Sequence, residues 1–217
     1  MTMAERTSCC VSILELAAPH TAEIDQLRRA AFRALRSGTP ARLSELAAET
    51  GHDLSQVRDV VGQLVAAGVA TIDGELGGDP AVIGAEGLTV AATSHRLLLE
   101  GKHLHTWCGF DTVGIPAALA VDGVAATTCP SCGGEIVLAL PGGQPPTSSV
   151  VGWWPQVSVG PVNESFCPVA GLFCSQEHVT TWRAANLSSR GEALSLIELA
   201  ERGRSTWSLF TEPGDTP

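Results

Sequence analysis

The chain has few basic residues and no long apolar run, and each shortage excludes a class of partner. Lys and Arg number 13 against 23 Asp and Glu, so the 217 residues carry a formal net charge of −10 at pH 7. A nucleic-acid backbone needs a basic face, and this balance argues against such a partner. A membrane-spanning helix takes about 18–20 consecutive apolar residues, and no stretch approaches that length. We therefore expect no nucleic-acid partner and no membrane partner.

Targeting signals and several familiar catalytic patterns are also missing. Residues 1–18 contain a single positive residue, Arg6, and the apolar stretch 9–14 is too short and too poorly flanked for a signal peptide. We find no Gly-rich phosphate loop, no Ser/His/Asp arrangement and no internal repeat. Seven cysteines, an odd number in a chain without an export signal, favour free thiols or metal ligands over disulfides. These features predict a cytoplasmic protein.

After a loosely ordered tail at residues 1–19, residues 20–100 are expected to form a winged helix-turn-helix-like domain. Apolar residues recur at helical spacing in segments 21–36, 43–50 and 54–67, and Thr21 is placed to cap the first. Residues 69–72 and 81–83 then indicate a β-ribbon.

Charge argues against DNA binding by this domain. It holds seven Arg and Lys against eleven Asp and Glu, and the helix that would enter a groove carries Arg58 beside Asp53 and Asp59. We interpret the domain as a structural unit that packs on the second half of the chain.

The second half, residues 101–210, has a different pattern. Short β-rich runs at 121–128, 135–140 and 150–159 are separated by Pro and Gly clusters. Helices are expected at 176–185 and 192–202, and residues 211–217 are expected to fray. The predicted fold class is α+β, with a helical N-terminal module followed by a mixed or antiparallel sheet with flanking helices.

One short segment carries recognisable chemistry. Trp107-Cys108-Gly109-Phe110-Asp111 sets a thiol and a carboxyl three residues apart, and Cys167 lies 59 residues after Cys108. Thiolates bind soft metals and a carboxyl can transfer a proton. If Thr106 caps a helix starting near Trp107, Cys108 lies in the first turn, where the helix dipole lowers a thiol pKa. Taken alone, such a pair is more often an inert buried thiol beside a capping carboxyl.

Over residues 20–205 the chain resembles the organomercurial (alkylmercury) lyases. The resemblance rests on residues 104–112, on Cys129, on Ser165-Phe166-Cys167 and on the lead-in at residues 87–94. It implies cleavage of carbon–mercury bonds by protonolysis, with Cys108 and Cys167 as mercury ligands. It also implies that Asp111 relays the proton and is a further candidate ligand.

The resemblance further implies that no cofactor is required and that the products are a hydrocarbon and Hg(II). Cellular thiols or a mercuric-reductase-type acceptor would then remove the metal, and the role would be mercury detoxification and resistance. The family carries a similar N-terminal helical domain, which agrees with a structural role for residues 20–100.

A competing constellation indicates zinc. Cys129-Pro130-Ser131-Cys132-Gly133-Gly134 is typical of a zinc knuckle, and Cys167, Cys174 and His178 are candidates to complete a tetrahedral site. Cys132 and Cys174 depart from the family pattern. Two alternatives therefore stay open: a divergent relative acting on another soft or carbon–heteroatom substrate, and a non-catalytic protein binding zinc or another soft metal.

The remaining candidates are more ordinary. His103 and His105 are expected to be solvated or hydrogen-bonded, and the tail residues Cys9 and Cys10 to have no role, although metal capture is an alternative. Core packing is favoured over a wall for an organic group at four aromatic residues and one aliphatic residue: Trp153, Trp154, Phe110, Phe166 and Ile115.

Overall fold

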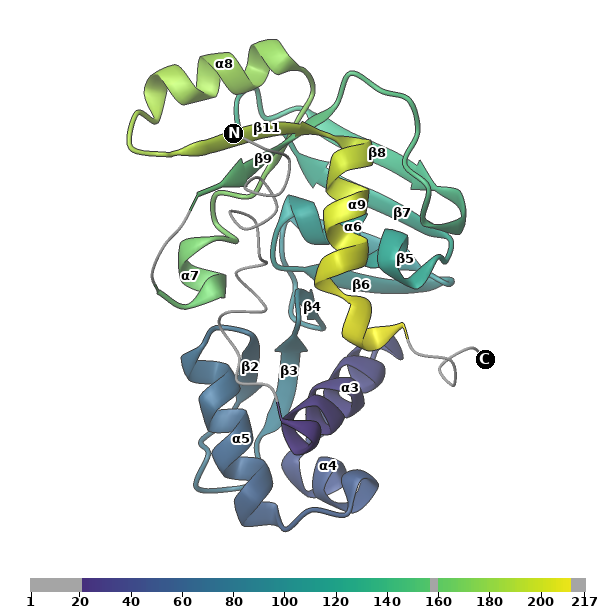
Figure 1. The fold of residues 1–217 in the computed structure, drawn as a ribbon, viewed down its shortest axis with the longest axis vertical. Coiled ribbons are helices and arrows are strands. Elements are labelled where there is room, and N and C mark those ends of the chain that lie inside the picture. Colours follow the sequence, from purple (N-terminus) through teal and green to yellow (C-terminus); the bar gives the residue numbers. More distant parts are fainter. Residues whose placement is uncertain (1–20, 157–159, 212–217) are drawn as a thin grey trace, which may run out of the picture.

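The strands of the protein form two antiparallel sheets (Figure 1). The computed structural model describes residues 21–156 and 160–211. The larger sheet has eight strands in the order β1-β3-β4-β6-β5-β7-β8, with β2 also paired to β3, and the smaller has three in the order β10-β9-β11. The strands of the larger sheet are β1 (Ala41–Arg42), β2 (Ala70–Asp73), β3 (Ala81–Ala85), β4 (Leu88–Thr89), β5 (His95–Leu99), β6 (Lys102–Thr106), β7 (Gly123–Thr128) and β8 (Glu135–Leu140). Those of the smaller are β9 (Val151–Pro155), β10 (Leu172–Phe173) and β11 (Gly191–Ser195).

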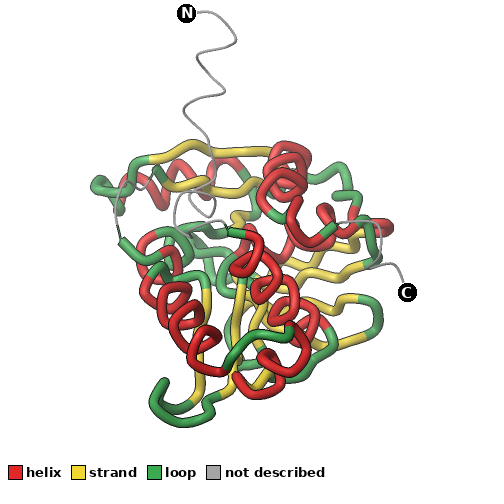
Figure 2. The backbone as a smooth tube through the Cα atoms, turned by 60° about the horizontal axis from the view of Figure 1, so that its bottom comes forward, coloured by secondary structure: helices red, strands yellow, loops and turns green. Residues whose placement is uncertain are grey.

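Helices lie at both ends of the molecule and along one side of the larger sheet. They are α3 (Ala22–Arg36), α4 (Leu43–Thr50), α5 (Leu54–Ala66), α6 (Gly109–Leu119), α7 (Val162–Ser165), α8 (Gln176–Ala185) and α9 (Leu196–Thr206), with short 3-10 turns at Pro141–Gly143 and Ser208–Phe210. Figures 1 and 2 show α3, α4 and α5 around β2 and β3 at one end of the molecule. Among the described residues, no helix is long and apolar enough to cross a membrane.

The N-terminal elements follow the order expected from the sequence. Thr21 caps α3, since its Oγ1 accepts a hydrogen bond from the Ile24 N–H at 3.3 Å. Helix α4 ends at Gly51, which takes a left-handed φ of +72° that glycine adopts without strain. Three helices and a β2–β3 pair are therefore present, and the assignment to the winged-helix class stays a prediction.

The larger sheet continues across the proposed domain boundary at residues 100 and 101. These two residues form the turn of the β5–β6 hairpin, and β3 and β4 link that hairpin to the N-terminal strands. One sheet therefore joins the two halves of the chain.

Helix α6 is the buried centre of the fold. It contacts α9 on one side and strands of the larger sheet on the other (Figure 1). Residues Gly109 to Ala117 of this helix are all buried, as expected for a helix that is apolar all round. The two helices come close at Gly114 and Gly203, where a Cβ on Gly203 would lie 2.3 Å from the Gly114 Cα.

The expected helix at 192–202 is wrong in its first part. Residues Gly191–Ser195 form β11, which pairs antiparallel with Val151–Pro155 of β9. Helix α9 starts only at Leu196, because the Ser195 Oγ accepts a hydrogen bond from the Glu198 N–H and caps the helix there. Pairing with β9 overrides the helical propensity of residues such as Glu192 and Leu194.

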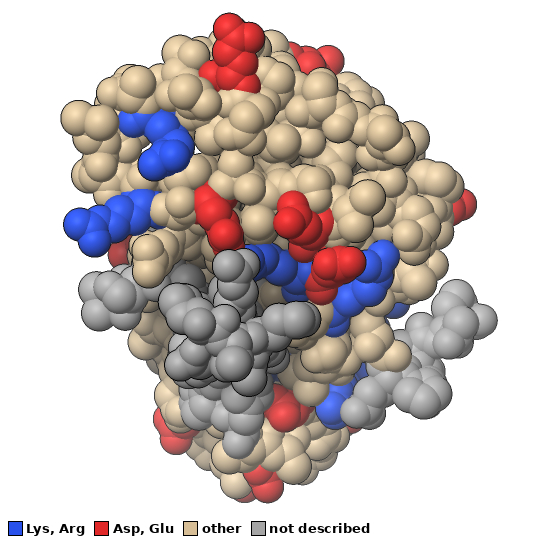
Figure 3. Space-filling view, turned by 45° about the horizontal axis from the view of Figure 1, so that its top comes forward, with Lys and Arg blue, Asp and Glu red and all other residues tan. Residues whose placement is uncertain are grey.

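Charges of both signs are mixed on the surface. On the face shown in Figure 3, Lys and Arg side chains are interspersed with Asp and Glu and form no continuous basic surface on that face. This arrangement agrees with the acidic balance of the sequence.

Candidate active site

Cys108, Asp111 and Cys167 meet inside the protein. Their two sulfurs and the nearest carboxylate oxygen all lie within 4.8 Å of one another. All three residues are buried, with exposed fractions of 0%, 3% and 7% in chain order. The fold therefore brings together the three residues that the sequence singled out, from segments far apart in the chain.

Local structure at the start of α6 places Cys108 beside Asp111. Cys108 is the N-cap residue of α6, and its backbone N–H donates to Asp111 Oδ2 at 3.0 Å. The expectation that Thr106 caps this helix is wrong. Thr106 is still part of β6, where it pairs with Leu88 and His95, and the helix begins three residues after it.

The predicted lowering of the Cys108 pKa is also wrong. Burial raises the pKa of the Cys108 thiol well above its ordinary value, and the neighbouring Cys167 side chain and Asp111 charge add to this rise. Removal from water disfavours the thiolate more than the helix N-terminus stabilises it. The Cys108 side chain therefore carries its proton at neutral pH.

Asp111 has a strongly perturbed carboxyl. Burial raises its pKa to about 7, although hydrogen bonds from the Cys108 thiol and the Cys108 N–H act in the opposite direction. A carboxyl that titrates near neutrality is able both to accept and to donate a proton under cellular conditions.

Gly87 packs directly behind the Asp111 carboxyl, a contact that the sequence did not reveal. A Cβ at this position would lie 2.8 Å from the Asp111 Cγ, and the residue adopts a left-handed φ of +88°. Its carbonyl accepts a hydrogen bond from the Trp107 N–H at 2.9 Å. Only a glycine permits this close packing behind the carboxyl. The sequence feature that could have drawn attention to this glycine is its position at the start of the lead-in segment 87–94.

Cys167 is held against the start of α6 by its neighbours in the chain. Its backbone N–H donates to the Val162 carbonyl of α7 at 3.1 Å. Three residues later the Ala170 carbonyl accepts a hydrogen bond from the Gly109 N–H at 3.0 Å. Since Gly109 follows Cys108 directly, this contact fixes the distance between the two thiol-bearing segments.

Four aromatic side chains, two of them next in sequence to Asp111 and Cys167, pack against one another. The Phe110 ring lies 4.9 Å from Trp154, 5.1 Å from Trp207 and 6.2 Å from Phe166, measured between ring centroids. Phe110 and Phe166 are buried and Trp154 is half-buried. Trp153 faces elsewhere, because it is buried against Trp182 at 5.7 Å.

A second cluster contains the candidate zinc ligands. The ligand atoms of Cys129, Cys132, Cys174 and His178 lie within 4.8 Å of one another, and Cys167 belongs to the first cluster instead. Burial opposes ionisation of the Cys129 thiol, but backbone N–H groups of Cys174, Cys132 and Ser131, together with the His178 side chain, outweigh it and lower its pKa to about 6. Burial and the two neighbouring sulfurs raise the pKa of Cys174 to about 11.

The other candidates lie apart from both clusters. His105 Nδ1 is hydrogen-bonded to the backbone of Thr93 at 3.1 Å, and His103 is exposed, in keeping with the ordinary roles expected for them. Cys9 and Cys10, like most of the two expected tails, lie outside the described residues.

Comparison with known proteins gives a consistent result. A family model described as alkylmercury lyase matches residues 88–207. An alkylmercury lyase of Staphylococcus epidermidis (strain ATCC 12228 / FDA PCI 1200) is 27% identical over 197 residues, which cover 89% of this chain and 87% of the relative. One from Streptomyces lividans is 26% identical over 196 residues, covering 88% and 86%.

A solved structure shares the fold. The crystal structure of the mercury-bound form of MerB2 superposes with a TM-score of 0.82 at 23% identity, covering 91% of this chain and 97% of that one. The family model spans more than half of the chain, and it includes both Cys108 and Cys167. This chain belongs to the alkylmercury lyase family.

Proposed function

We propose that this enzyme cleaves the carbon–mercury bond of organomercurials by protonolysis at Cys108, Asp111 and Cys167. The observation that carries the proposal is the meeting of two thiols and one carboxyl within 4.8 Å, all buried, in a chain of the alkylmercury lyase family. Two sulfurs suit a soft metal, and the carboxyl lies close enough to exchange a proton with a group bound to that metal.

The first step exchanges ligands on mercury. The substrate enters as R–Hg–SR′, in which SR′ is a small cellular thiolate. Cys108, which holds its proton because burial raises its pKa, forms a sulfur–mercury bond and passes that proton to the Asp111 carboxylate. Cys167 forms the second sulfur–mercury bond, and its proton leaves with the departing R′S⁻ as R′SH.

The second step breaks the carbon–mercury bond. Two sulfur ligands raise the electron density on the carbon, and Asp111 delivers its proton there. The electron pair of the carbon–mercury bond forms the new C–H bond, so R–H departs and Hg(II) stays on the two thiolates. One R–Hg–SR′ and two thiols thus give R–H, R′SH and a dithiolate of Hg(II), with every proton accounted for. A pKa of about 7 lets Asp111 complete both transfers near neutral pH.

The aromatic side chains beside the site suit an organic group. Phe110 and Phe166, which are close in sequence to Cys108 and Cys167, form an apolar cluster with Trp154 of β9. We assign to this cluster the contact with the alkyl or aryl group R, in addition to its packing role. An apolar surrounding also excludes water, which strengthens the electrostatic interactions within the site.

Release of the product needs a second thiol carrier. A dithiolate complex of Hg(II) is removed by exchange with further thiolates, so we propose cellular thiols or a mercuric-reductase-type protein as the acceptor. Free thiols at Cys108 and Cys167 require a reducing compartment, and we therefore place the enzyme in the cytoplasm, with a role in mercury resistance.

Incubation with phenylmercury and excess thiol tests the proposal, with benzene measured by gas chromatography. Asp111→Ala should retain mercury but lose turnover, because the thiols remain while the proton carrier is gone. Cys108→Ala and Cys167→Ala should lose both. Asp59→Asn, an exposed carboxyl of α5, is the control and should match the unmodified enzyme.

The alternatives make different predictions in the same assay. A divergent relative acting on another substrate would release no benzene above the thiol-only background while still binding mercury at Cys108 and Cys167. A non-catalytic zinc protein would show no dependence on Asp111. Either result would overturn the proposed reaction.

A further inference from the structure

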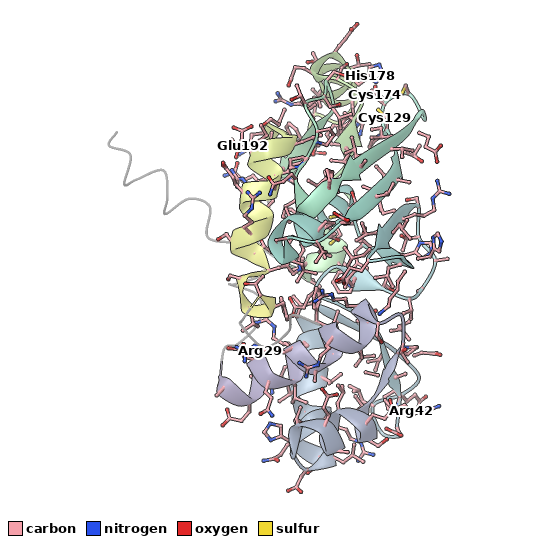
Figure 4. All side chains as sticks on the ribbon, turned by 90° about the vertical axis from the view of Figure 1, so that its right-hand side faces the viewer. Arg29, Arg42, Cys129, Cys174, His178 and Glu192 are labelled. Carbon is pink, nitrogen blue, oxygen red and sulfur yellow. The ribbon has the colours of Figure 1, made fainter. Side chains whose placement is uncertain are left out.

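We propose that Cys129, Cys132, Cys174 and His178 form a structural zinc site that is separate from the catalytic thiols. The four ligand atoms lie within 4.8 Å of one another. Figure 4 shows Cys129, Cys174 and His178 together at one end of the molecule, with Arg42 toward the other. No step of the protonolysis involves these residues.

A tight turn presents the first two sulfurs. Residues 129–134 join β7 to β8, and the Cys129 N–H donates to the Gly134 carbonyl while the Gly133 N–H donates to the Cys129 carbonyl, both at 2.9 Å. Gly133 takes a left-handed φ of +71°, and the Gly134 N–H donates to the Cys132 Sγ at 3.4 Å. N–H groups aimed at sulfur stabilise a thiolate, and a Cys-x2-Cys turn directs both sulfurs to one metal.

The other two ligands come from the start of α8. Cys174 follows β10 directly, and its carbonyl accepts a hydrogen bond from the Ser149 Oγ at 2.9 Å. Ser175 caps the helix by accepting from the His178 N–H at 3.4 Å. The cap fixes the first turn, so His178 faces the same point as Cys174.

The distances fit one tetrahedral ion. With Zn–S near 2.3 Å and Zn–N near 2.0–2.1 Å, tetrahedral angles separate two sulfur ligands by about 3.8 Å and a sulfur from a nitrogen by about 3.6 Å. Cys132 Sγ and Cys174 Sγ lie 3.9 Å apart, and Cys129 Sγ and His178 Nδ1 lie 3.5 Å apart. Three thiolates and one imidazole are a typical ligand set for structural zinc, and four protein ligands leave no open position for substrate.

Zinc at this place would fasten the two sheets together beside the catalytic centre. Cys129 and Cys132 lie in the turn between two strands of the larger sheet, whereas Cys174 follows a strand of the smaller one. The two segments already touch, since a Cβ on Gly171 would lie 2.8 Å from the Pro130 Cγ.

Cys174 ends a segment, residues 167–174, that begins with Cys167. Within this segment the Ala170 carbonyl accepts a hydrogen bond from the Gly109 N–H. A zinc ion bound to Cys174 would fix the end of this segment and so limit how far Cys167 can move away from Cys108.

Metal analysis tests the site without any mercury substrate. The full chain is purified from zinc-supplemented cells under reducing conditions, dialysed, and analysed for metal by mass spectrometry. We expect one zinc per chain in the unmodified protein and less than a tenth of that in Cys132→Ser. Because Cys132 is exposed, this change removes a ligand with little effect on packing. Cys108→Ser/Cys167→Ser is the matched control, since it also removes thiols, and it should keep its zinc.

Cobalt provides a readout on the unmodified protein. Co²⁺ added to protein freed of metal by a chelator should give the intense visible bands of tetrahedral thiolate coordination, with one equivalent at saturation, and zinc should abolish them. Chelation should lower the melting temperature of the unmodified protein and leave that of Cys132→Ser unchanged. Zinc-free protein without such bands, or zinc lost from the Cys108→Ser/Cys167→Ser variant alone, would overturn the proposal.

Discussion

At the scale of single residues, burial destabilises the ionised form of the Asp111 carboxyl more than its hydrogen bonds stabilise it. Hydrogen bonds from the Cys108 side chain and from the backbone of Cys108 and Trp107 stabilise the ionised form, yet burial dominates and raises the pKa to about 7. In the unfolded chain the same group titrates near pH 4. The native state therefore binds the proton more tightly than the unfolded state, and stability depends on pH between these two values.

Replacing Asp111 by Asn should change this pH dependence. The stabilising contribution of the protonated carboxyl is fully present below about pH 4 and is lost as the pH rises through about 7. Each unit of pKa difference corresponds to about 1.4 kcal/mol, so Asp111→Asn should gain several kcal/mol over the unmodified protein between pH 4 and pH 8. The measurement is the free energy of unfolding in urea at a series of pH values. A difference that does not vary with pH would contradict the raised pKa of Asp111.

Gly87→Ala should damage catalysis by displacing Asp111. The new Cβ would lie 2.8 Å from the carboxyl carbon, so the carboxyl must move away from the two sulfurs. A left-handed alanine also costs about 1–2 kcal/mol of stability. We expect benzene release to fall at least tenfold while mercury binding persists.

Gly101→Ala is the matched control for this prediction. Gly101 has a similar φ of +79°, but nothing lies within 4 Å of its Cβ position. It should lose similar stability and keep its turnover, measured under the same conditions. Equal losses of turnover in the two variants would show that backbone strain, not the contact with Asp111, is responsible.

The sequence predicted the identity of the site residues better than their ionisation. The family resemblance, carried by residues 104–112 and Ser165-Phe166-Cys167, selected the three residues that meet, whereas the spacing of Cys108 and Asp111 alone favoured an inert thiol. The direction of the Cys108 pKa shift was not predictable, because it depends on complete burial of the sulfur beside a carboxyl and a second thiol. Burial of this kind is set by the packing of distant segments, which no local pattern reports.

At the scale of secondary structure, α6 holds Cys108 and Asp111 in place by packing tightly on α9. The contact is made through glycine, since a Cβ on Gly203 would lie 2.3 Å from the Gly114 Cα and 2.6 Å from the Gly114 carbonyl oxygen. A side chain at this crossing would push the helices apart and shift the start of α6, where Cys108 and Asp111 lie.

Gly203→Ala should therefore destabilise the protein, against the usual trend for helices. Within a helix, replacing Gly by Ala commonly stabilises by about 1 kcal/mol. Here the overpacking should dominate and cost about 1–3 kcal/mol, measured as the change in free energy of unfolding. Ser205→Ala, at an exposed position of α9, should stay within about 0.5 kcal/mol. A gain of stability in Gly203→Ala would show that the two helices are not in contact as described.

Helices and strands with a clear residue pattern of their own were predictable from the sequence, whereas those that form only by pairing with a distant segment were not. The predicted strand at 135–140 and the helix at 176–185 have the bounds that the structure shows. Residues 192–195 were misassigned to a helix because β11 forms only through its pairing with β9. Spacing alone did not settle which side chains complete the zinc set, since both Cys167 with Cys174 and Cys174 with His178 were open as partners of Cys129 and Cys132, and the structure brings Cys174 and His178 to them.

At the scale of the whole molecule, a buried ion pair joins the N-terminal helices to the backbone that packs behind Asp111. Arg28 of α3 donates to both carboxylate oxygens of Glu86 at 2.7 and 3.0 Å. The exposed fractions of the two side chains are only 4% and 3%. The Glu86 carbonyl also accepts a hydrogen bond from Trp207 Nε1 at 2.7 Å. Glu86 directly precedes Gly87, so the pair fixes the backbone that packs behind Asp111.

Glu86→Gln should consequently be costly in both stability and turnover. Arg28 also contacts Asp25 at 3.4 Å, so the loss should fall toward the lower end of the about 3–5 kcal/mol that is typical for removing one partner of a buried ion pair. Arg28→Met/Glu86→Gln should recover part of that loss, because both buried charges of the pair are then removed together, and a double-mutant cycle of unfolding free energies measures the coupling. Breaking the exposed pair of Arg33 and Glu49, with exposed fractions of 53% and 46%, by Glu49→Gln should cost at most about 1 kcal/mol. If Glu86→Gln costs no more than Glu49→Gln and keeps full benzene release, the N-terminal helices do not support the catalytic centre through this pair.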